Sequence, residues 1–295
     1  MLRQAGALIK PDSTRPDSTR PGSAPLRPDL VERAHLKDPR DASHQMHRYA
    51  PAPDLSSLLR RFWIPVWSVP SGQEAPQKVL QHPVCLVVVS DDYARFYGVV
   101  SGLSTTTLVG EGWAVGVMLA PAAGYLLAGP VEAFTNRYVH LSEILGAGTG
   151  ALVEQVRAVM AAGPYDVGAH RAAVGAVEGV LRRFLPVDDE GELVNAVVAH
   201  VEEQPDVLRV AQVCDRFGLS ERALQRLVRR RLGLSPKWLI QRRRLQEGAE
   251  RLRAGSSTQV EVAAALGYAD QPHFIRDFAR VVGMTPGQFA ALHSG

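Results

Sequence analysis

The last third of the chain contains one helical unit twice. The second copy follows the first with a constant offset of 50 residues from the helix-capping position onward. The matched residues are Gly218-Leu219-Ser220, Leu224, Val228 and Gly233-Leu234-Ser235-Pro236 in the first copy, and Gly267-Tyr268-Ala269-Asp270, Phe274, Phe278 and Gly283-Met284-Thr285-Pro286 in the second. Each copy predicts a short apolar helix, a glycine turn, a capped second helix and a Gly-x-Ser/Thr-Pro stop. Two helices joined in this way are typical of helix-turn-helix units that bind DNA.

In the first copy, apolar residues at helical spacing predict a helix over residues 208–217, and Gly218 is suited to end it. Ser220 is suited to cap the next helix, which we expect over about residues 220–231. One face of that helix is apolar, and the other carries Arg222, Gln225, Arg226 and Arg229. Arginine and glutamine recognise guanine and adenine edges in the major groove. An ordinary solvated face is the alternative, but the helix has five arginines and one acid.

In the second copy, Asp270 is the expected N-cap of a helix over about residues 271–282, and Pro272 lies in its first turn, where a missing N–H costs little. The apolar residues Phe274, Ile275, Phe278 and Val282 define the face expected to be buried. The outer face carries His273, Arg276 and Arg280, whereas Gln271 lies nearer the core. The two copies therefore predict two recognition helices.

A helix-forming stretch over residues 236–253 joins the two copies and includes the basic run Arg242-Arg243-Arg244. At about 1.5 Å per residue it would form a rod of roughly 27 Å. Such a rod can hold two recognition helices about one DNA turn, or roughly 34 Å, apart. One chain could therefore occupy two successive major grooves.

Residues 193–295 resemble the DNA-binding domain of AraC/XylS-type transcription regulators. The resemblance is carried by residues 267–278, Gly-Tyr-Ala-Asp-Gln-Pro-His-Phe-Ile-Arg-Asp-Phe, and by residues 283–289, Gly-Met-Thr-Pro-Gly-Gln-Phe. It implies base-reading positions at Arg222, Gln225 and Arg226 in the first unit. The corresponding positions in the second unit are Gln271, His273 and Arg276. The full set of expected DNA-binding residues is Ser220, Arg222, Gln225, Arg226, Arg229, Arg230, Gln271, His273, Arg276 and Arg280.

The resemblance also implies partners and a location. We expect a double-stranded DNA operator, RNA polymerase, a small-molecule effector and pairing with a second copy of the chain. The expected location is the cytoplasm, at the nucleoid, with no membrane partner. In one respect the sequence departs from the family pattern, because Ala290 follows Phe289 where the family commonly has arginine.

The charge distribution agrees with a DNA-binding C-terminal region. The whole chain has a formal net charge of +3. Residues 193–295 hold 15 basic and 10 acidic side chains, whereas residues 1–192 hold 18 and 20. The basic excess thus lies where the helix-turn-helix repeat lies.

The N-terminal region divides into a leader and a β-rich domain. Residues 1–45 contain Pro-Asp-Ser-Thr-Arg twice and many further prolines, so we expect a disordered leader. Residues 46–185 are expected to form a sensor or dimerisation domain, followed by an acidic linker over residues 186–192 and the DNA-binding domain over residues 193–295. Strand candidates with turns between them suggest a small barrel or sandwich that ends in amphipathic helices. These candidates are residues 61–67, 84–89, 94–99, 105–109 and 113–119.

The predicted fold class is therefore α+β, with a β-barrel-like sensor domain and an all-α domain of two helix-turn-helix units. We expect a small, largely apolar or aromatic effector to bind in the barrel. Its pocket would be lined by some of four aromatic residues, Trp63, Trp67, Trp113 and Tyr125. Plain core packing of these aromatic side chains is the alternative.

Two alternative functions remain at this stage: a DNA-binding protein without a ligand, and a barrel enzyme with a DNA-binding tail. Against the enzyme, the glycine-rich residues 145–150 lack the Lys-Ser/Thr of a phosphate-binding loop. His82 and His140 are the only plausible barrel metal ligands, and no histidine pair has metal-site spacing. Cys85 and Cys214 lie in apolar runs and are expected to be buried thiols. We predict no catalytic residue, metal or cofactor.

Overall fold

The computed structural model describes residues 41–255 and 257–293. The Pro-Asp-Ser-Thr-Arg repeats and most of the expected leader lie outside the described residues. Strand β1 begins at His44, inside the range expected for the leader. This strand was not predicted from the sequence, because His44–Tyr49 is polar at most positions.

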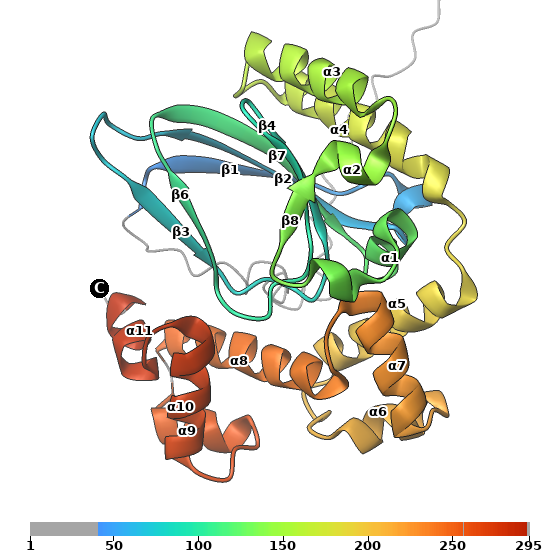
Figure 1. Cartoon of the computed structure of the whole chain (residues 1–295). Coiled ribbons are helices and arrows are strands. Elements are labelled where there is room, and N and C mark those ends of the chain that lie inside the picture. The colour runs from blue at the N-terminus through green and yellow to red at the C-terminus, as the bar shows by residue number, and fades with distance from the viewer. Residues whose placement is uncertain (1–40, 256, 294–295) are drawn as a thin grey trace, which may run out of the picture.

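The N-terminal region is built on a six-stranded antiparallel sheet with the order β1-β2-β7-β4-β5-β8 (Figure 1). A separate antiparallel pair, β3 with β6, forms a ribbon that faces one side of this sheet. We call this pair the β3–β6 ribbon. The strands are β1 (His44–Tyr49), β2 (Leu59–Ser68), β3 (Ala75–Val79), β4 (Leu86–Ser90), β5 (Ala94–Tyr97), β6 (Ser104–Leu108), β7 (Glu111–Leu119) and β8 (Tyr138–His140).

The expected β-rich region is confirmed, but its strands do not form one closed barrel. All five strand candidates occur as strands, with shifted ends. Strands β1, β3 and β8 were not expected. Strand β3 is polar and contains Pro76, and β8 is short and lies directly before a helix, so neither shows the apolar alternation of a strand.

Alternation along the strands gives the six-stranded sheet two different faces. On one face, Phe62, Ile64 and Val66 join a large apolar cluster with the neighbouring helices. On the other face, Leu86, Val88 and Ala114 pack with Trp63, Trp67 and other side chains in a smaller cluster. The first face is the core of the domain, and the second faces the β3–β6 ribbon.

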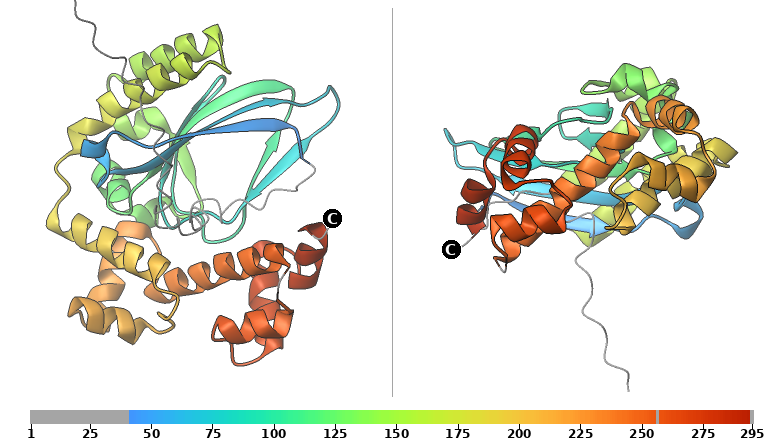
Figure 2. Two further views of the ribbon diagram at one scale, coloured as in Figure 1. Left: turned by 180° about the vertical axis from the view of Figure 1, so that it is seen from behind. Right: turned by 90° about the horizontal axis from the view of Figure 1, so that it is seen from below.

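Helices cover the core face of the sheet and lie at one end of it (Figures 1 and 2). The longest are an antiparallel pair, α3 and α4, whose residues Leu152, Val156, Val174 and Val177 join the large apolar cluster. The elements of this layer are η2 (Pro53–Leu55), α1 (Ala123–Ala128), η3 (Val131–Phe134), α2 (Leu141–Leu145), α3 (Thr149–Ala162), α4 (Val167–Leu181) and η4 (Arg182–Phe184).

The C-terminal region is helical throughout its described residues. Helix α5 begins at Asp189 and is capped by Asp188, so a helix occupies part of the expected linker over residues 186–192. The first helix-turn-helix unit contains α6 and α7, and the second contains α9 and α10. The helices are α5 (Asp189–Glu203), α6 (Val210–Phe217), α7 (Glu221–Leu232), α8 (Pro236–Ala254), α9 (Gln259–Ala265), α10 (Gln271–Val282) and α11 (Pro286–His293).

Helix α8 extends beneath the β-rich region and connects the two units (Figures 1 and 2). Leu239 and Ile240 in its first half belong to the same apolar cluster as α7 and the sheet. Leu245, Ala249 and Leu252 in its second half belong to a second cluster with α9, α10 and α11. The rod expected from the sequence is therefore present, and each half is buried in one unit.

Candidate DNA-binding surface and cavity

The first helix-turn-helix unit has the local geometry that its sequence predicts. Gly218 ends α6 with a φ of 64°, a conformation that glycine adopts without steric cost. The Ser220 hydroxyl accepts a hydrogen bond from the Ala223 amide at 3.2 Å and so caps α7. Leu224 and Val228 are fully buried, which fixes the rotation of α7 about its axis. The sequence thereby determines which side chains of α7 face solvent.

The exposed face of α7 carries Arg222, Gln225 and Arg226. In the part of the chain that the structure describes, these three side chains have no hydrogen-bond or ion-pair partner. Their polar groups are therefore available to a ligand outside the protein. Bidentate recognition of base edges needs donors that are not already engaged.

The second unit repeats this geometry. The Asp270 carboxylate accepts a hydrogen bond from the His273 amide at 2.7 Å and caps α10. Phe274, Phe278 and Val282 are fully buried. His273, Arg276 and Arg280 are exposed, and Gln271 is half-buried.

Asp277 occupies part of the outer face of α10. Its carboxylate lies 3.1 Å from an Arg280 guanidinium nitrogen and 3.7 Å from the His273 ring nitrogen. It also accepts a hydrogen bond from Gln241 Nε2 of α8 at 2.7 Å. Among the three exposed basic residues of α10, only Arg276 has no hydrogen-bond or ion-pair partner within residues 41–255 and 257–293. Helix α10 therefore presents fewer free donors than α7.

The last turn of α7 is docked on the N-terminal region. Arg229 Nε donates to Glu132 of η3 at 2.9 Å, and Arg230 contacts the Tyr125 hydroxyl of α1 and Glu190 of α5. The next residue, Arg231, is buried and pairs with Asp188 and Glu190. The sequence predicted Arg229 and Arg230 as DNA contacts, but here both are engaged by groups on other elements. No sequence pattern indicated these long-range ion pairs.

The three consecutive arginines of α8 point to three different parts of the molecule, because successive helical residues are about 100° apart. Arg242 donates to the main-chain oxygens of Gln81 and Gly102 in the N-terminal region, at 2.9 and 3.0 Å. Arg243 donates to the Val207 oxygen before α6 at 2.9 Å and to Glu247. Arg244 donates to the Leu266 oxygen of the second unit at 2.7 Å. The basic run therefore joins α8 to its surroundings within the protein.

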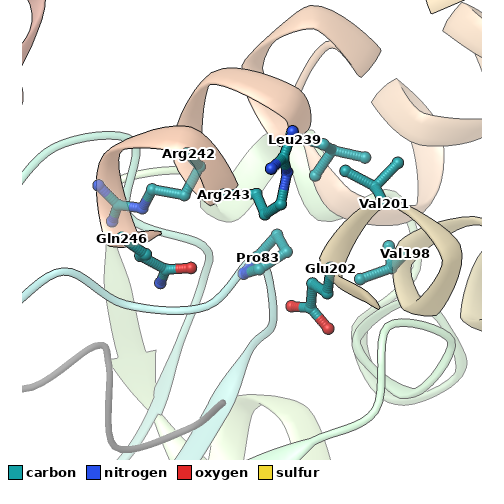
Figure 3. A pocket seen from close by; sticks show the side chains of 8 residues that line it. All are labelled: Pro83, Val198, Val201, Glu202, Leu239, Arg242, Arg243 and Gln246. Atoms are coloured by element: carbon teal, nitrogen blue, oxygen red, sulfur yellow. The ribbon is translucent and has the colours of Figure 1, made fainter. Parts of the chain in front are cut away.

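Figure 3 shows where α8, α5 and the segment after β3 meet. Arg242, Arg243 and Gln246 of α8 lie beside Pro83 and Glu202 around a space of about 10 Å³, which has room for about one water molecule. Burial lowers the pKa of Arg242 to about 9. Although burial raises the pKa of Glu202, Arg60 at 2.9 Å and His82 at 3.0 Å together hold it at about 2. This is an ion-paired contact between α5 and the β-rich region.

A cavity of about 450 Å³ lies between the six-stranded sheet and the β3–β6 ribbon. Trp63 and Trp67 of β2 line it, and each lies opposite a glycine of β7 in the strand register. A Cβ atom at Gly116 would come within 2.3 Å of the Trp63 ring, and one at Gly112 within 2.4 Å of the Trp67 ring. The Trp67 indole N–H donates to the Val109 oxygen at 3.2 Å. The two indoles therefore lie against bare backbone and form an aromatic wall.

Some of four aromatic residues were expected to line a pocket, and of these Trp63 and Trp67 line the cavity whereas Trp113 and Tyr125 lie elsewhere. Trp113 is paired with Val66 and is buried in the large apolar cluster, on the opposite face of the sheet from Trp63 and Trp67. Tyr125 lies on α1, beneath the guanidinium groups of Arg230 and Arg231. Trp113 lies opposite Val66, and neighbouring residues of a strand point to opposite faces, so Trp113 and Trp67 are on different faces of the sheet. This pairing register cannot be read from the sequence.

Other residues singled out in the sequence have structural positions. Cys85 and Cys214 are buried free thiols, and burial raises the pKa of Cys85 to about 12. His140 is the N-cap residue of α2, and residues 146–148 form a turn before α3. No group of three candidate metal ligands occurs within the described ranges. None of the helices described is both long and apolar enough to cross a bilayer.

A β-rich domain followed by two capped helix-turn-helix units on a shared rod defines a two-part chain with a double DNA-binding motif. Residues 213–291 match the family model of a helix-turn-helix domain, and residues 47–140 match that of a domain of unknown function, DUF6597. The C-terminal part of this chain is a helix-turn-helix domain of the AraC type.

Several known proteins are similar to this chain over that C-terminal part. The uncharacterized HTH-type transcriptional regulator YfiF of Bacillus subtilis is 29% identical over 111 residues, which cover 37% of this chain and 34% of YfiF. The HTH-type transcriptional activator RhaS of Escherichia fergusonii is 31% identical over 93 residues, which cover 31% of this chain and 34% of RhaS. The matched segment thus spans about a third of the length of these relatives.

Two solved structures are similar to this chain over different shares of its length. The C-terminal domain of AraT, a response regulator from Geobacillus stearothermophilus, is 24% identical, covers 35% of this chain and 88% of that domain, and has a TM-score of 0.32. ToxT from Vibrio cholerae is 13% identical, covers 86% of this chain and all of that structure, and has a TM-score of 0.38.

Proposed function

We propose that this protein is a transcription regulator that binds an operator in double-stranded DNA through α7 and α10. The observation that carries the proposal is the pair of capped helices whose buried faces are fixed and whose exposed faces carry unpaired arginines, Arg226 and Arg276. The AraC-type domain and the names of the relatives in the C-terminal match support it. Base contacts are assigned to Arg222, Gln225 and Arg226 and to Gln271, His273 and Arg276.

Helix α8 sets the distance between the two recognition helices. It has 19 residues, which at about 1.5 Å per residue gives a rod of roughly 28 Å. Successive major grooves on one face of DNA are about 34 Å apart. The two helices are therefore suited to neighbouring grooves. Contacts to the DNA phosphates beside these grooves are assigned to Ser220, Arg229, Arg230 and Arg280.

A small molecule in the cavity beside Trp63 and Trp67 would control this binding. The cavity volume is within the usual range of ligand sites, about 300–1,000 Å³. RNA polymerase and a second copy of the chain complete the proposed set of partners, with the protein acting at the nucleoid in the cytoplasm. A regulator without a ligand is the second candidate.

The test of DNA reading uses Arg226→Ala and Arg276→Ala. A duplex selected from a random-sequence pool by repeated binding to the wild-type chain serves as the operator. We expect each variant to lose about 1–3 kcal/mol of binding free energy and to tolerate more bases at one position, because each arginine reads one base edge. Fluorescence anisotropy and repeated selection measure these two effects.

The matched control is Arg171→Ala, which removes an exposed arginine of α4 on the N-terminal region. It should bind the operator as the wild type does. If both recognition-helix variants bind with wild-type affinity and selectivity, α7 and α10 are not the reading helices.

A further inference from the structure

The two walls of the cavity belong to two separate sheets. The six-stranded sheet supplies Trp63, Trp67 and Met118, whereas the β3–β6 ribbon supplies Gln77, Ser104 and Thr106. In the strand pairing of the described residues, the ribbon has no neighbour in the six-stranded sheet. No strand ladder therefore spans the cavity, and the two walls are joined at the turn between β6 and β7, where the Val69 amide donates to the Gly110 oxygen at 2.8 Å.

Both strands of the β3–β6 ribbon are bound to α8 at one end of the ribbon, where Val79 pairs with Ser104. After β3, the Leu80 and Gln81 oxygens accept hydrogen bonds from Gln246 at 2.8 Å and from Arg242 at 2.9 Å. Before β6, the Gly102 oxygen accepts from Arg242 at 3.0 Å, and the Ser101 oxygen accepts from the Trp238 indole at 3.2 Å. One guanidinium group, that of Arg242, thus joins both strands of the ribbon, at the same end, to one helix.

Apolar packing joins the same end of the ribbon to the second helix-turn-helix unit. Leu80 is fully buried in the cluster that contains Phe278 and Val282 of α10. Leu103, directly before β6, packs against the same cluster. A displacement of the ribbon would therefore also displace α8 and the core behind α10.

The other wall of the cavity is joined to the first unit. The six-stranded sheet and its helices share one continuous apolar cluster with Leu224 and Val228 of α7. At the end of α7, Glu132 pairs with Arg229, and the Thr135 hydroxyl donates to the Gly233 oxygen at 3.3 Å. The six-stranded sheet is therefore attached to α7, whereas the ribbon is attached to α8 and to the core behind α10.

We propose that an aromatic molecule bearing hydroxyl groups binds between these walls and that the β3–β6 ribbon transmits its presence to α8 and α10. The proposal rests on the proposed function and assigns the route by which the effector acts. A ligand that changes the separation of the walls changes the position of α10 relative to α7. It can shift DNA affinity only by its differential affinity for the two arrangements.

The chemistry of the two walls indicates the ligand class. Charged side chains of both signs also line the cavity, namely Arg48, Arg61, Asp91, Asp92 and Glu111, so the lining does not select a ligand of one charge. Indole rings laid flat against Gly112 and Gly116 offer a broad apolar surface for stacking, which favours an aromatic ring system. The ribbon wall offers hydroxyl and amide groups from Ser104, Thr106 and Gln77. These groups suit hydroxyl substituents on the ligand, because each can donate or accept a hydrogen bond.

The experiment measures coupling between the two sites in the full-length chain. A panel of phenol, catechol, 1-naphthol and 2-naphthol is titrated against tryptophan fluorescence, with and without the selected operator duplex. We expect at least one compound to bind and to change operator affinity by about fivefold or more, with the operator changing its affinity by the same factor. Arg242→Met should reduce this factor to less than about twofold while the compound still binds.

Two further variants make the outcome decisive. Trp238→Phe removes the hydrogen bond to the Ser101 oxygen and part of the ring beside the Arg242 guanidinium, and it should reduce the coupling less than Arg242→Met does. Arg251→Met makes the same chemical change as Arg242→Met on the same helix, at a residue paired with Glu247, and should leave the coupling at the wild-type value.

Three results would overturn parts of the proposal separately. Wild-type coupling in both Arg242→Met and Trp238→Phe would exclude transmission through the ribbon. Binding of none of the four compounds would exclude the ligand class. Failure of the wild-type chain to select any duplex would refute the proposed function itself, whatever the compounds do.

Discussion

At the scale of single residues, Arg229 has two competing partners. Its guanidinium pairs with Glu132, and the same group lies one turn beyond Gln225 and Arg226 on the proposed reading helix. Side-chain hydrogen bonding to Arg229 lowers the pKa of Glu132, so this carboxylate is ionised near neutral pH. A negative charge so close to α7 repels DNA phosphates. It also pairs with the Arg229 guanidinium, which could otherwise bind a phosphate.

Glu132→Gln should therefore strengthen operator binding. We expect an increase of about two- to fivefold at low salt, the range for one exposed charge pair, and a smaller increase at high salt because of screening. Anisotropy titrations at several salt concentrations measure it. Asp54→Asn is the control, since it removes a carboxylate from another exposed ion pair, with Arg182, remote from α7 in the sequence and the fold. An equal gain in both variants would show that only net charge matters.

At the scale of elements, the capping residues determine where the recognition helices begin and help to stabilise them. Asp270→Ala removes the acceptor for the His273 amide and should lower the free energy of unfolding by about 0.5–2 kcal/mol, because that amide is left without its partner. Asp270→Asn should retain most of the stability, since asparagine caps helices about as well. Thermal unfolding of the full chain compares the two. Equal loss in both variants would mean that the charge of Asp270, and not its capping bond, stabilises α10.

The same scale shows how much of this molecule can be predicted from its sequence. Both helix-turn-helix units and the rod between them could be predicted, because glycine turns, capping residues and 3.6-residue spacing are local signals. The exposed positions of Arg222, Arg226 and Arg276 followed from that spacing. Such signals act within one or two turns of chain, so they identify a helix and its faces without identifying what those faces meet.

Contacts between distant segments could not be predicted from the same signals. The pairing of Arg229 with Glu132 joins residues 97 positions apart, and that of Arg242 with Gln81 joins residues 161 positions apart. The polar strand β3 and its ribbon were missed for a related reason, because one ribbon face lines a cavity and needs no apolar alternation. The sequence could not show which of the four aromatic residues line the pocket. Trp67 and Trp113 lie on opposite faces of the sheet because of the strand register, and that register is set by tertiary pairing.

At the scale of the whole molecule, α8 is held at both ends and in the middle. Its first half is buried with α7, its second half with α10, and Arg242 bonds its centre to the ribbon. Because α8 is one continuous helix that is packed against three parts of the molecule, each arrangement of the chain gives one distance between the two recognition helices. In the chain without a ligand, the distance between the two DNA contacts should therefore be constant.

A hydroxyl-radical footprint of the full chain on its selected duplex tests this geometry. We expect two short protected patches on one face of the DNA, about one helical turn apart, because α7 and α10 would enter successive major grooves. Arg276→Ala should weaken protection in one patch and leave the other, whereas Arg226→Ala should do the reverse. A single patch that only Arg226→Ala removes would show that α10 stabilises the domain without reading DNA. The contacts of Asp277 with His273 and Arg280 leave α10 with fewer free donors than α7. Protection of the α10 patch should therefore fall less steeply with salt if binding breaks those contacts, because salt also weakens the ion pairs that compete with DNA.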